Sequence, residues 1–308
     1  MLRYIGSRLL QSLFIVVSIT LGVFIILRVT AGDPARVRAP VFASPEIINQ
    51  YRKDFGTDKS LPEQLVRFVS GALHGNLGDS FRYQRPVLDL IAEALPYTLR
   101  LALLALFISV TVSVTLGVLA ARYPGSAWDW LSGVVAAAAQ AAPVFWVGIL
   151  LSTYLGVVLG IFPAGGYSGF SSLILPAVAA SVSIIPTELR VLREAMRSVL
   201  GQEYVRAARA NGIRERRVTF VYALRNATLP LLTVIGIDVG YLLGGVIVAE
   251  IVFNFPGIGQ LALVALNSRD YPLVQAITIV TATVFVLVNL VIDLLYTVVD
   301  PRIRLRTR

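Results

Sequence analysis

Apolar residues in this chain gather in six long runs that are separated by shorter polar stretches. A helix needs about 20 mainly apolar residues to cross the hydrocarbon core of a bilayer. We therefore predict six transmembrane helices, near Leu9–Leu27, Leu99–Ala121, Leu131–Ile161, Leu173–Leu189, Leu229–Val252 and Val274–Val299. The third run is overlong and contains Pro143, so we expect a kink or a break there. The fourth run is the weakest, and its helix can continue through Leu200 as it leaves the membrane.

Composition supports lipid as the solvent of these runs. Of the 308 residues, 56% are hydrophobic and 15% are charged. A soluble domain averages about 45–50% apolar residues and about 25% charged residues. Arg3 and Arg8 precede the first run as they would in a secretory signal. That run exceeds the usual length of about 7–15 residues, so we prefer an uncleaved helix. The chain has no cysteine, which excludes disulfides and thiolate sites.

The net charge of +9 is explained mainly by where the arginines lie. Short cytoplasmic loops of membrane proteins carry an excess of Lys and Arg. The segment between the fourth and fifth runs holds Arg190, Arg193, Arg197, Arg206, Arg209, Arg214, Arg216, Arg217 and Arg225. The N-terminus, the loop after the second run and the tail after Asp300 are also basic. Both termini are therefore predicted to be cytoplasmic, and the basic charge does not indicate nucleic-acid binding.

The same pattern predicts how the chain is divided. Residues 1–27 form the first transmembrane helix, and residues 28–96 form an extracytoplasmic region that is long enough for a small subdomain. Residues 97–299 form the membrane core, with a cytoplasmic helix at about 203–212, and residues 300–308 form a cytoplasmic tail.

Several kinds of chemistry have no counterpart in the sequence. There is no G-x-x-x-x-G-K-[ST] phosphate loop, H-E-x-x-H or G-x-S-x-G motif, and no paired-carboxylate arrangement. The lone His74 has no second metal-ligand residue at a suitable spacing, so we interpret it as a surface or packing residue. We therefore predict no catalytic residues and no metal site. If ATP drives this protein, the ATPase is another polypeptide and must dock on the cytoplasmic side.

The predicted cytoplasmic helix is the candidate docking surface. Glu203 lies at its start, where a carboxylate suits the helix dipole, and Gly212 is a natural stop. The helix is too short and too polar to span a membrane. One face contains Tyr204, Ala207, Ala208 and Asn211, at i, i+3, i+4 and i+7. Two central alanines would let another surface approach the backbone closely, although an ordinary solvated helix remains an equal alternative.

Here the sequence resembles a known family. Glu203, the Ala207-Ala208 pair and Gly212, followed by an apolar segment entered through Leu229-Pro230, resemble the signature of binding-protein-dependent ABC permeases. Further matching motifs are Gly32-Asp33-Pro34, Gly78-Asp79-Ser80, Leu95-Pro96-Tyr97-Thr98-Leu99, Pro256-Gly257-Ile258-Gly259 and Asp300-Pro301-Arg302. Their order and spacing over essentially the whole chain resemble the first permease subunit of dipeptide, oligopeptide and nickel importers.

The resemblance implies an all-α integral membrane protein with the type I ABC importer fold, multi-pass in the cytoplasmic membrane of a prokaryote. It implies a homologous second permease, two ATP-binding domains and an extracytoplasmic solute-binding protein as partners. ATP and Mg²⁺ would be bound by those partners, with no cofactor in this chain. The coupling helix would contact the ATP-binding subunit through Glu203, Tyr204, Ala207, Ala208, Arg209 and Gly212.

The function implied is ATP-driven import of peptides by alternating access. One alternative keeps the fold and changes the cargo to nickel or another small solute. A second alternative is a secondary transporter driven by an ion gradient, although such folds usually show internal repeats. A membrane-bound enzyme is disfavoured by the missing catalytic motifs.

Two of the acids within predicted spans are singled out as candidates, Asp238 and Asp293, because a charge there costs about 2.5–3.5 kcal/mol on insertion scales. Asp238 is a candidate for the translocation path, and the alternative is a helix–helix hydrogen bond or a bridge to the partner permease. Asp293 is given a structural role near the cytoplasmic interface. The extracytoplasmic segment after the fifth run is hypothesised to cap the outer mouth and meet the binding protein, or else to be a plain re-entrant loop. Its candidate residues are Glu250, Phe253, Pro256, Gly257 and Gly259.

Overall fold

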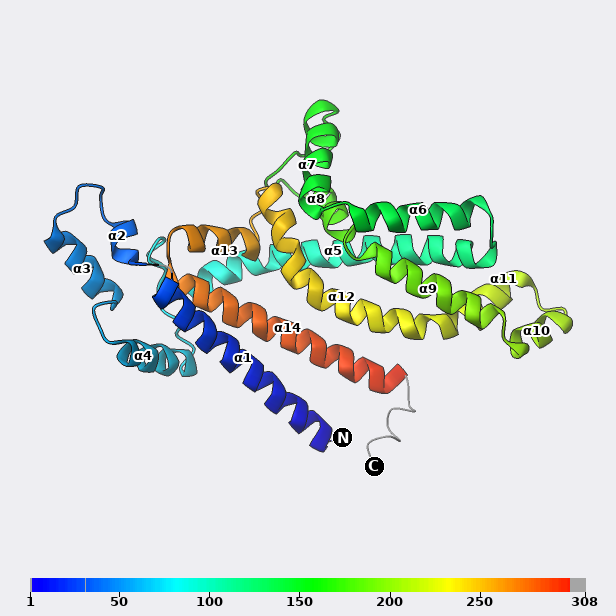
Figure 1. Cartoon of the computed structure of the whole chain (residues 1–308), viewed down its shortest axis with the longest axis horizontal. Coiled ribbons are helices and arrows are strands. Elements are labelled where there is room, and N and C mark those ends of the chain that lie inside the picture. Colours follow the sequence, from blue (N-terminus) through cyan, green and yellow to red (C-terminus); the bar gives the residue numbers. More distant parts are fainter. Residues whose placement is uncertain (1, 31, 300–308) are drawn as a thin grey trace. The chain divides into compact units, whose positions relative to one another are not determined.

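The structure, a computed structural model, describes the backbone of residues 2–30 and 32–299, with side chains except those of residues 2–9, 12, 30, 243–245 and 291–299. The predicted tail at 300–308 and the side chain of Asp293 lie outside the described part. The described residues form helices and contain no strand (Figure 1). Residue contacts divide the chain into two compact units. Unit 1 contains the chain up to Tyr97 and Pro256–Leu290, and unit 2 contains Thr98–Phe255 and the chain from Val291 onward.

Unit 1 combines the predicted extracytoplasmic region with the first and last long helices. Its helices are α1 (Leu2–Thr30), α2 (Pro34–Arg38), α3 (Pro45–Phe55), α4 (Leu61–Leu73), the start of α5 (Val87–Arg122), α13 (Ile258–Asn267) and α14 (Tyr271–Val299) up to Leu290. The region between the first two spans is thus a set of three short helices. Prolines occupy the first turns of these helices, where the missing N–H costs no hydrogen bond.

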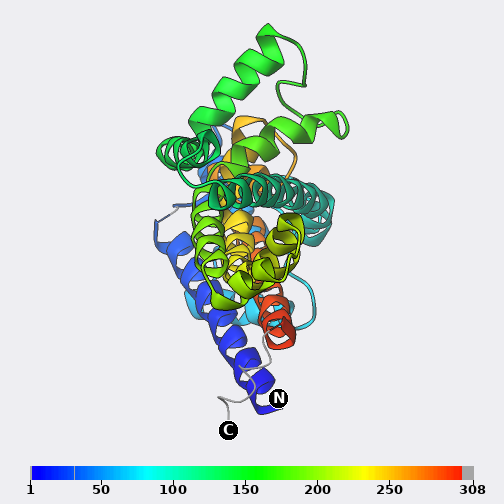
Figure 2. The same cartoon turned by 90° about the vertical axis from the view of Figure 1, so that its right-hand side faces the viewer.

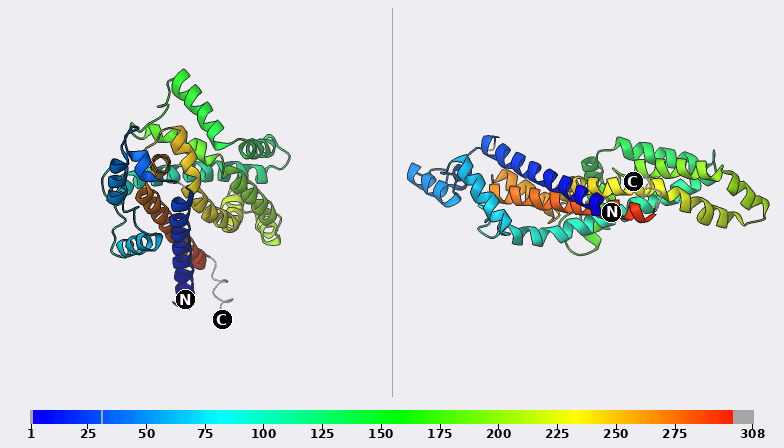
Figure 3. Two further views of the ribbon diagram at one scale, coloured as in Figure 1. Left: turned by 60° about the vertical axis from the view of Figure 1, so that its left-hand side comes forward. Right: turned by 90° about the horizontal axis from the view of Figure 1, so that it is seen from below.

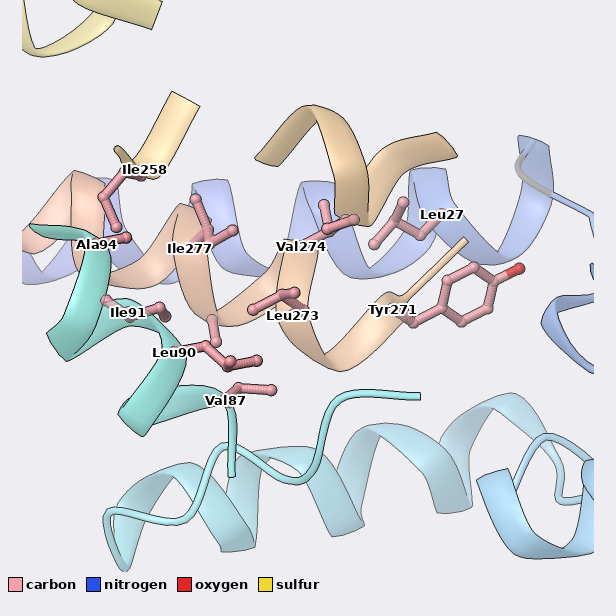
Figure 4. Close-up of a cluster of buried hydrophobic side chains, with 12 residues drawn as sticks. Leu27, Val87, Leu90, Ile91, Ala94, Ile258, Tyr271, Leu273, Val274 and Ile277 are labelled. Atoms are coloured by element: carbon pink, nitrogen blue, oxygen red, sulfur yellow. The ribbon is translucent and has the colours of Figure 1, made fainter. Parts of the chain in front are cut away.

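The core of unit 1 lies where α1, α5, α13 and α14 meet (Figure 4). Leu27 of α1, Ile91 of α5 and Leu273 of α14 are buried in one apolar cluster, which Ile258 joins from α13. Segments that are far apart in sequence therefore share one core. This explains why the contacts group residues 28–96 with the two flanking long helices.

Unit 2 holds the rest of the membrane core. It contains the remainder of α5, α6 (Ala127–Ala141), α7 (Val144–Leu151), η1 (Ser152–Val158), α8 (Ser171–Ser181), α9 (Ile185–Leu200), α10 (Glu203–Ala210), α11 (Glu215–Arg217), η2 (Val218–Ala223) and α12 (Leu224–Val252). The elements η1 and η2 are π-helices, which are rare and are often found at functional sites.

The third and fourth predicted spans are bent helix pairs. The axes of Ala127–Ala141 and Val144–Val158 differ by 102°, and α6 and α7 form a sharp corner in Figures 1 and 2. Pro143 lies at this corner and forces Ala142 into an extended conformation, so the expected break is confirmed. The fourth run continues through Leu200 as expected, but with a 64° bend between α8 and α9.

Three described helices are long and apolar enough to cross a membrane, and five segments qualify if each bent pair counts as one span. Helix α1, with 29 residues, covers the first predicted run. Each of the six predicted runs therefore falls on a helix or a helix pair. Leu229-Pro230, expected at the entry of the fifth span, lies inside α12, which starts at Leu224.

Helix α9 is the central packing element of unit 2. It packs against α6 and α12, and Leu192 and Met196 are fully buried with Val118 of α5 and Leu231 of α12. Gly117 of α5 permits a close crossing, because a Cβ atom there would lie 3.2 Å from the Leu192 side chain. Since α9 leads directly into α10, its packing fixes where the predicted docking helix emerges.

Candidate functional site

The predicted docking helix exists as α10, from Glu203 to Ala210. Glu203 lies in its first turn, and Gln202 precedes it in an extended conformation. The helix ends in a Schellman motif, in which Ile213 N–H donates to Ala208 O at 3.1 Å and Gly212 N–H donates to Arg209 O at 2.9 Å. Gly212 has φ +73°, a left-handed conformation that suits glycine.

The structure divides the residues that were predicted to form one docking face. Val205 and Ala208 are buried against the rest of the chain, whereas Tyr204 and Ala207 are exposed. Val205 and Ala208 are three positions apart and form the inward side of this short helix. A partner could therefore meet Ala207 but not Ala208, which supports the helix from within.

Tyr204 is held on the exposed side by a polar contact to the next segment. The Asn226 side chain donates to the Tyr204 hydroxyl at 2.9 Å and to Tyr222 O at 2.9 Å. Tyr222 belongs to η2, whose π-helical turn carries this carbonyl. The first turn of α10 is thereby tied to the start of α12.

Arg209 ties the second turn of α10 to another helix end. Its Nε donates to Glu215 at 2.8 Å, and the other carboxylate oxygen of Glu215 lies 3.0 Å from Arg122 at the end of α5. Arg209 is therefore engaged within the chain. The two sets of contacts make α10 a braced element at the end of unit 2, beyond α9 (Figure 3).

A second ionic cluster fixes α9 upstream of α10. Asp129 in the first turn of α6 pairs with Arg193 and with Arg197, the latter at 2.8 Å. Its other oxygen accepts from Gly125 N–H at 2.9 Å. Two of the arginines that indicated the cytoplasmic side thus also clamp α6 to α9.

Asp238 of α12 is buried inside unit 2, where it faces Glu188 of α9. Glu188 is fully buried and accepts from Ser109 Oγ of α5 at 3.2 Å. Glu188 was not among the residues predicted from the sequence, although it lies within the fourth predicted run and is an acid in an apolar span like Asp238. This arrangement supplies a partner for the helix–helix alternative considered for Asp238.

Most of the candidate outer-mouth residues are enclosed. Glu250 is fully buried and accepts from Thr98 Oγ1 at 2.6 Å, and Phe253 is buried with Leu175 and Ala179 of α8. Gly257 and Gly259, at the start of α13, are also buried, while Pro256 is exposed. Pro256 is therefore the residue of this set that is accessible to a partner.

His74 ends α4 on the surface, and its Nδ1 donates to Ser70 O at 2.7 Å. Within the described part of the chain, no group of three or more potential ligand residues could hold a metal ion.

These features define a multi-pass helical membrane protein. It has long apolar helices, two bent helix pairs and a short helix, α10, that is braced beside an arginine-rich stretch. Two family models match the chain. Residues 113–305 match the inner membrane component of binding-protein-dependent transport systems, and residues 1–102 match the N-terminal part of such membrane components. The chain belongs to this family and is a multi-pass protein of the inner membrane.

Similar proteins extend over the full length. The chain is 38% identical to "Probable peptide ABC transporter permease protein y4tP" of Sinorhizobium fredii, covering 98% of this chain and 99% of the relative. It is 36% identical to the glutathione transport system permease protein GsiC of Escherichia coli O6:H1, covering 99% of each. It is 35% identical to the dipeptide transport system permease protein DppB of Escherichia coli K12, again over 99% of each chain.

Among solved structures, the MetNI methionine ABC transporter contains a similar fold. The match has a TM-score of 0.57 at 17% identity and covers 68% of this chain and 96% of the transporter chain. The predicted all-α type I ABC importer permease fold is therefore confirmed. The family also makes the chain a permease subunit, whose ATPase resides in separate subunits, rather than an ion-driven transporter or an enzyme.

Proposed function

We propose that this chain is the permease subunit of an ATP-driven importer of peptides. The observation that carries the proposal is similarity over 98–99% of this chain to permeases whose names specify peptide, glutathione and dipeptide transport. Nickel, the alternative cargo considered from the sequence, serves as the competing solute in the test below.

The proposed assembly contains a homologous second permease, two ATP-binding domains and an extracytoplasmic solute-binding protein. ATP and Mg²⁺ are bound by the ATP-binding domains. We propose that the exposed side of α10, with Glu203, Tyr204, Ala207 and Gly212, fits into the ATP-binding subunit. The small Ala207 side chain supports this assignment, since it allows close approach to the helix backbone.

The contacts of α10 suggest how movement would be transmitted. Its first turn is tied to η2 and α12 through Tyr204 and Asn226, and its second turn to α5 through Arg209 and Glu215. When ATP closes the ATP-binding domains, a displaced α10 would move these helix ends with it. The bundle would then open outward to receive solute, and hydrolysis would reset it.

Two further assignments belong to the same proposal. Asp238 contributes to the translocation path at the α9–α12 contact, and Pro256, with the segment around it, meets the solute-binding protein. The burial of Glu250, Phe253, Gly257 and Gly259 supports a role for these four residues in shaping that segment rather than in direct contact.

The docking proposal is tested by replacing single alanines with phenylalanine at an exposed site on α10, at a control site and at a buried site. Ala207→Phe should reduce co-purification of the ATP-binding subunit at least tenfold while leaving the thermal stability of the permease unchanged. Ala127→Phe, at an exposed alanine in the first turn of α6, is the control and should leave co-purification intact. Ala208→Phe should instead destabilise the permease, because that side chain is buried. Intact co-purification with Ala207→Phe would overturn the docking assignment.

The cargo is tested with the complete complex in membrane vesicles. ATP-dependent uptake of a labelled dipeptide is compared with uptake of labelled nickel, with the solute-binding protein present. Dipeptide uptake is expected, and nickel uptake without dipeptide uptake would overturn the peptide assignment.

A further inference from the structure

Unit 1 contains a cavity on the side that the arginine distribution assigns to the outside. Its volume is about 670 Å³, within the range of about 300–1,000 Å³ that is usual for small-molecule sites. The walls are formed by the end of α1, by α3 and α4, by the segment around Gly78 and by the first turns of α14. The transport proposal assigns no role to this cavity.

The charged residues of the cavity wall balance one another. Arg28 and Arg67 contribute two positive charges, and Asp54 and Asp79 contribute two negative charges. Arg28 is held in place because its Nε donates to Gln64 at 2.7 Å and its guanidinium lies 3.5 Å from the Phe24 ring centroid. A cavity with both signs and no net charge suits a ligand that carries both an ammonium and a carboxylate group.

Gln275 provides the observation that points most directly to a ligand. This residue of α14 lines the cavity and is 3% exposed, yet its Nε2 has no hydrogen-bond partner. Burial of an amide donor without an acceptor destabilises the fold. A carbonyl or carboxylate oxygen inside the cavity would satisfy it.

Aromatic residues give the cavity an apolar part. Phe55 of α3 stacks on Phe81 with ring centroids 4.0 Å apart, and both residues line the cavity with Phe68 of α4. Such surfaces can receive an apolar side chain while the polar groups fix its backbone.

We propose that this cavity binds a short peptide with free termini, before or during its passage through the importer. This inference rests on the proposed peptide cargo. The peptide carboxylate and carbonyl groups are received by Gln275 and the cavity arginines, and its ammonium group is received by Asp54 and Asp79. Phe55, Phe68 and Phe81 contact its side chains.

The test measures binding of labelled glycyl-phenylalanine to the purified permease complex in nanodiscs, without the solute-binding protein. Saturable binding is expected, and Gln275→Leu, which removes the donor at similar volume, should weaken it at least tenfold. Arg67→Gln changes an exposed side chain and should also weaken binding about tenfold. Arg38→Gln, at an exposed arginine of α2 outside the cavity wall, is the matched control and should have no effect. N-acetyl-glycyl-phenylalaninamide, which lacks both charges, should bind at least tenfold more weakly.

Absence of saturable binding, or equal binding by wild type, Gln275→Leu and Arg67→Gln, would overturn the cavity proposal. Uptake of the same peptide by the complete importer is measured in parallel. Uptake without binding in the cavity would leave the importer proposal standing and remove only this inference. Cavity binding without uptake would support the site while contradicting the proposed transport function.

Discussion

The Ser80 hydroxyl donates to Oδ2 of Asp270 at 2.5 Å, although the two residues are 190 positions apart. Both side chains are buried, and the same oxygen accepts from Arg82 N–H at 3.1 Å. The other oxygen of Asp270 accepts from Leu273 N–H at 3.3 Å in the first turn of α14, where a carboxylate also suits the helix dipole. One carboxylate therefore fixes a turn next to the cavity and the start of the last span.

Asp270→Ala should lower the thermal midpoint of the purified permease more than Ser80→Ala does. The first change leaves three donors without their acceptor, and each buried unpaired group costs about 1–3 kcal/mol. The second change leaves Asp270 with its two backbone donors. The double variant should be less stable than Asp270→Ala alone only by the bond that Ser80 Oγ accepts from Tyr83 N–H at 2.9 Å, because the bond between Ser80 and Asp270 is already lost. The measurement is size-exclusion chromatography after heating, and an equal or larger effect of Ser80→Ala would contradict this account.

Gly212→Ala should destabilise the end of α10, whereas Gly201→Ala should not. Gly212 has φ +73°, which costs an L-residue about 1–2 kcal/mol. Gly201 ends α9 at φ −82°, a conformation that alanine adopts freely, and it is the matched control. Limited proteolysis of the loop after α10 provides the readout, with faster cleavage expected for Gly212→Ala alone. Equal cleavage of the two variants would show that the left-handed turn is not required.

Asp129→Ala should lower the thermal midpoint of the permease, because Arg193 and Arg197 lose the carboxylate that they share. The Nε atoms of both arginines are already buried without a hydrogen-bond partner, so no alternative acceptor is at hand. Glu194→Ala removes an exposed acid from the same helix and is the control. The thermal midpoint should fall for Asp129→Ala and stay unchanged for Glu194→Ala. A similarly small effect of both variants would show that the contact of Asp129 with Arg193 and Arg197 stabilises the permease no more than an exposed ion pair does.

The transmembrane pattern was predictable because the length of an apolar run and the presence of proline act locally. The break at Pro143 follows from the restriction that proline places on Ala142. The 64° bend before α9 and the π-helical turns were not predicted, since they depend on packing between helices. The contact between Ser80 and Asp270 could not be predicted from a local sequence pattern either, because the two residues are 190 positions apart.

At the candidate site, the sequence located α10 and its glycine stop but not the orientation of the helix. The spacing of Ala207 and Ala208 places both on one stripe, and only the surrounding chain decides that Ala208 faces inward. Glu188 could have been found by the rule that drew attention to Asp238, because both acids lie in predicted spans. The cavity around Gln275 could not be predicted, since its wall is assembled from five separate segments.

Replacement of Asp238 separates a role in transport from a role in packing. Asp238 is 7% exposed and faces Glu188, so an asparagine there can donate to the Glu188 carboxylate and remove the repulsion between two acids. Asp238→Asn should therefore assemble normally with an unchanged or raised thermal midpoint. Asp238→Leu should lower the midpoint, because it leaves Glu188 buried without its polar neighbour.

Uptake of labelled dipeptide by the assembled complex then tests the path assignment. If Asp238 contributes to the translocation path, Asp238→Asn lowers uptake several-fold at unchanged assembly, because the amide no longer presents a carboxylate to a passing ammonium group. Thr233→Val changes an exposed polar residue of the same helix and is the control, with uptake expected to remain at the wild-type rate. Unchanged uptake by the Asp238→Asn complex would remove this residue from the path and leave it as a contact between α9 and α12.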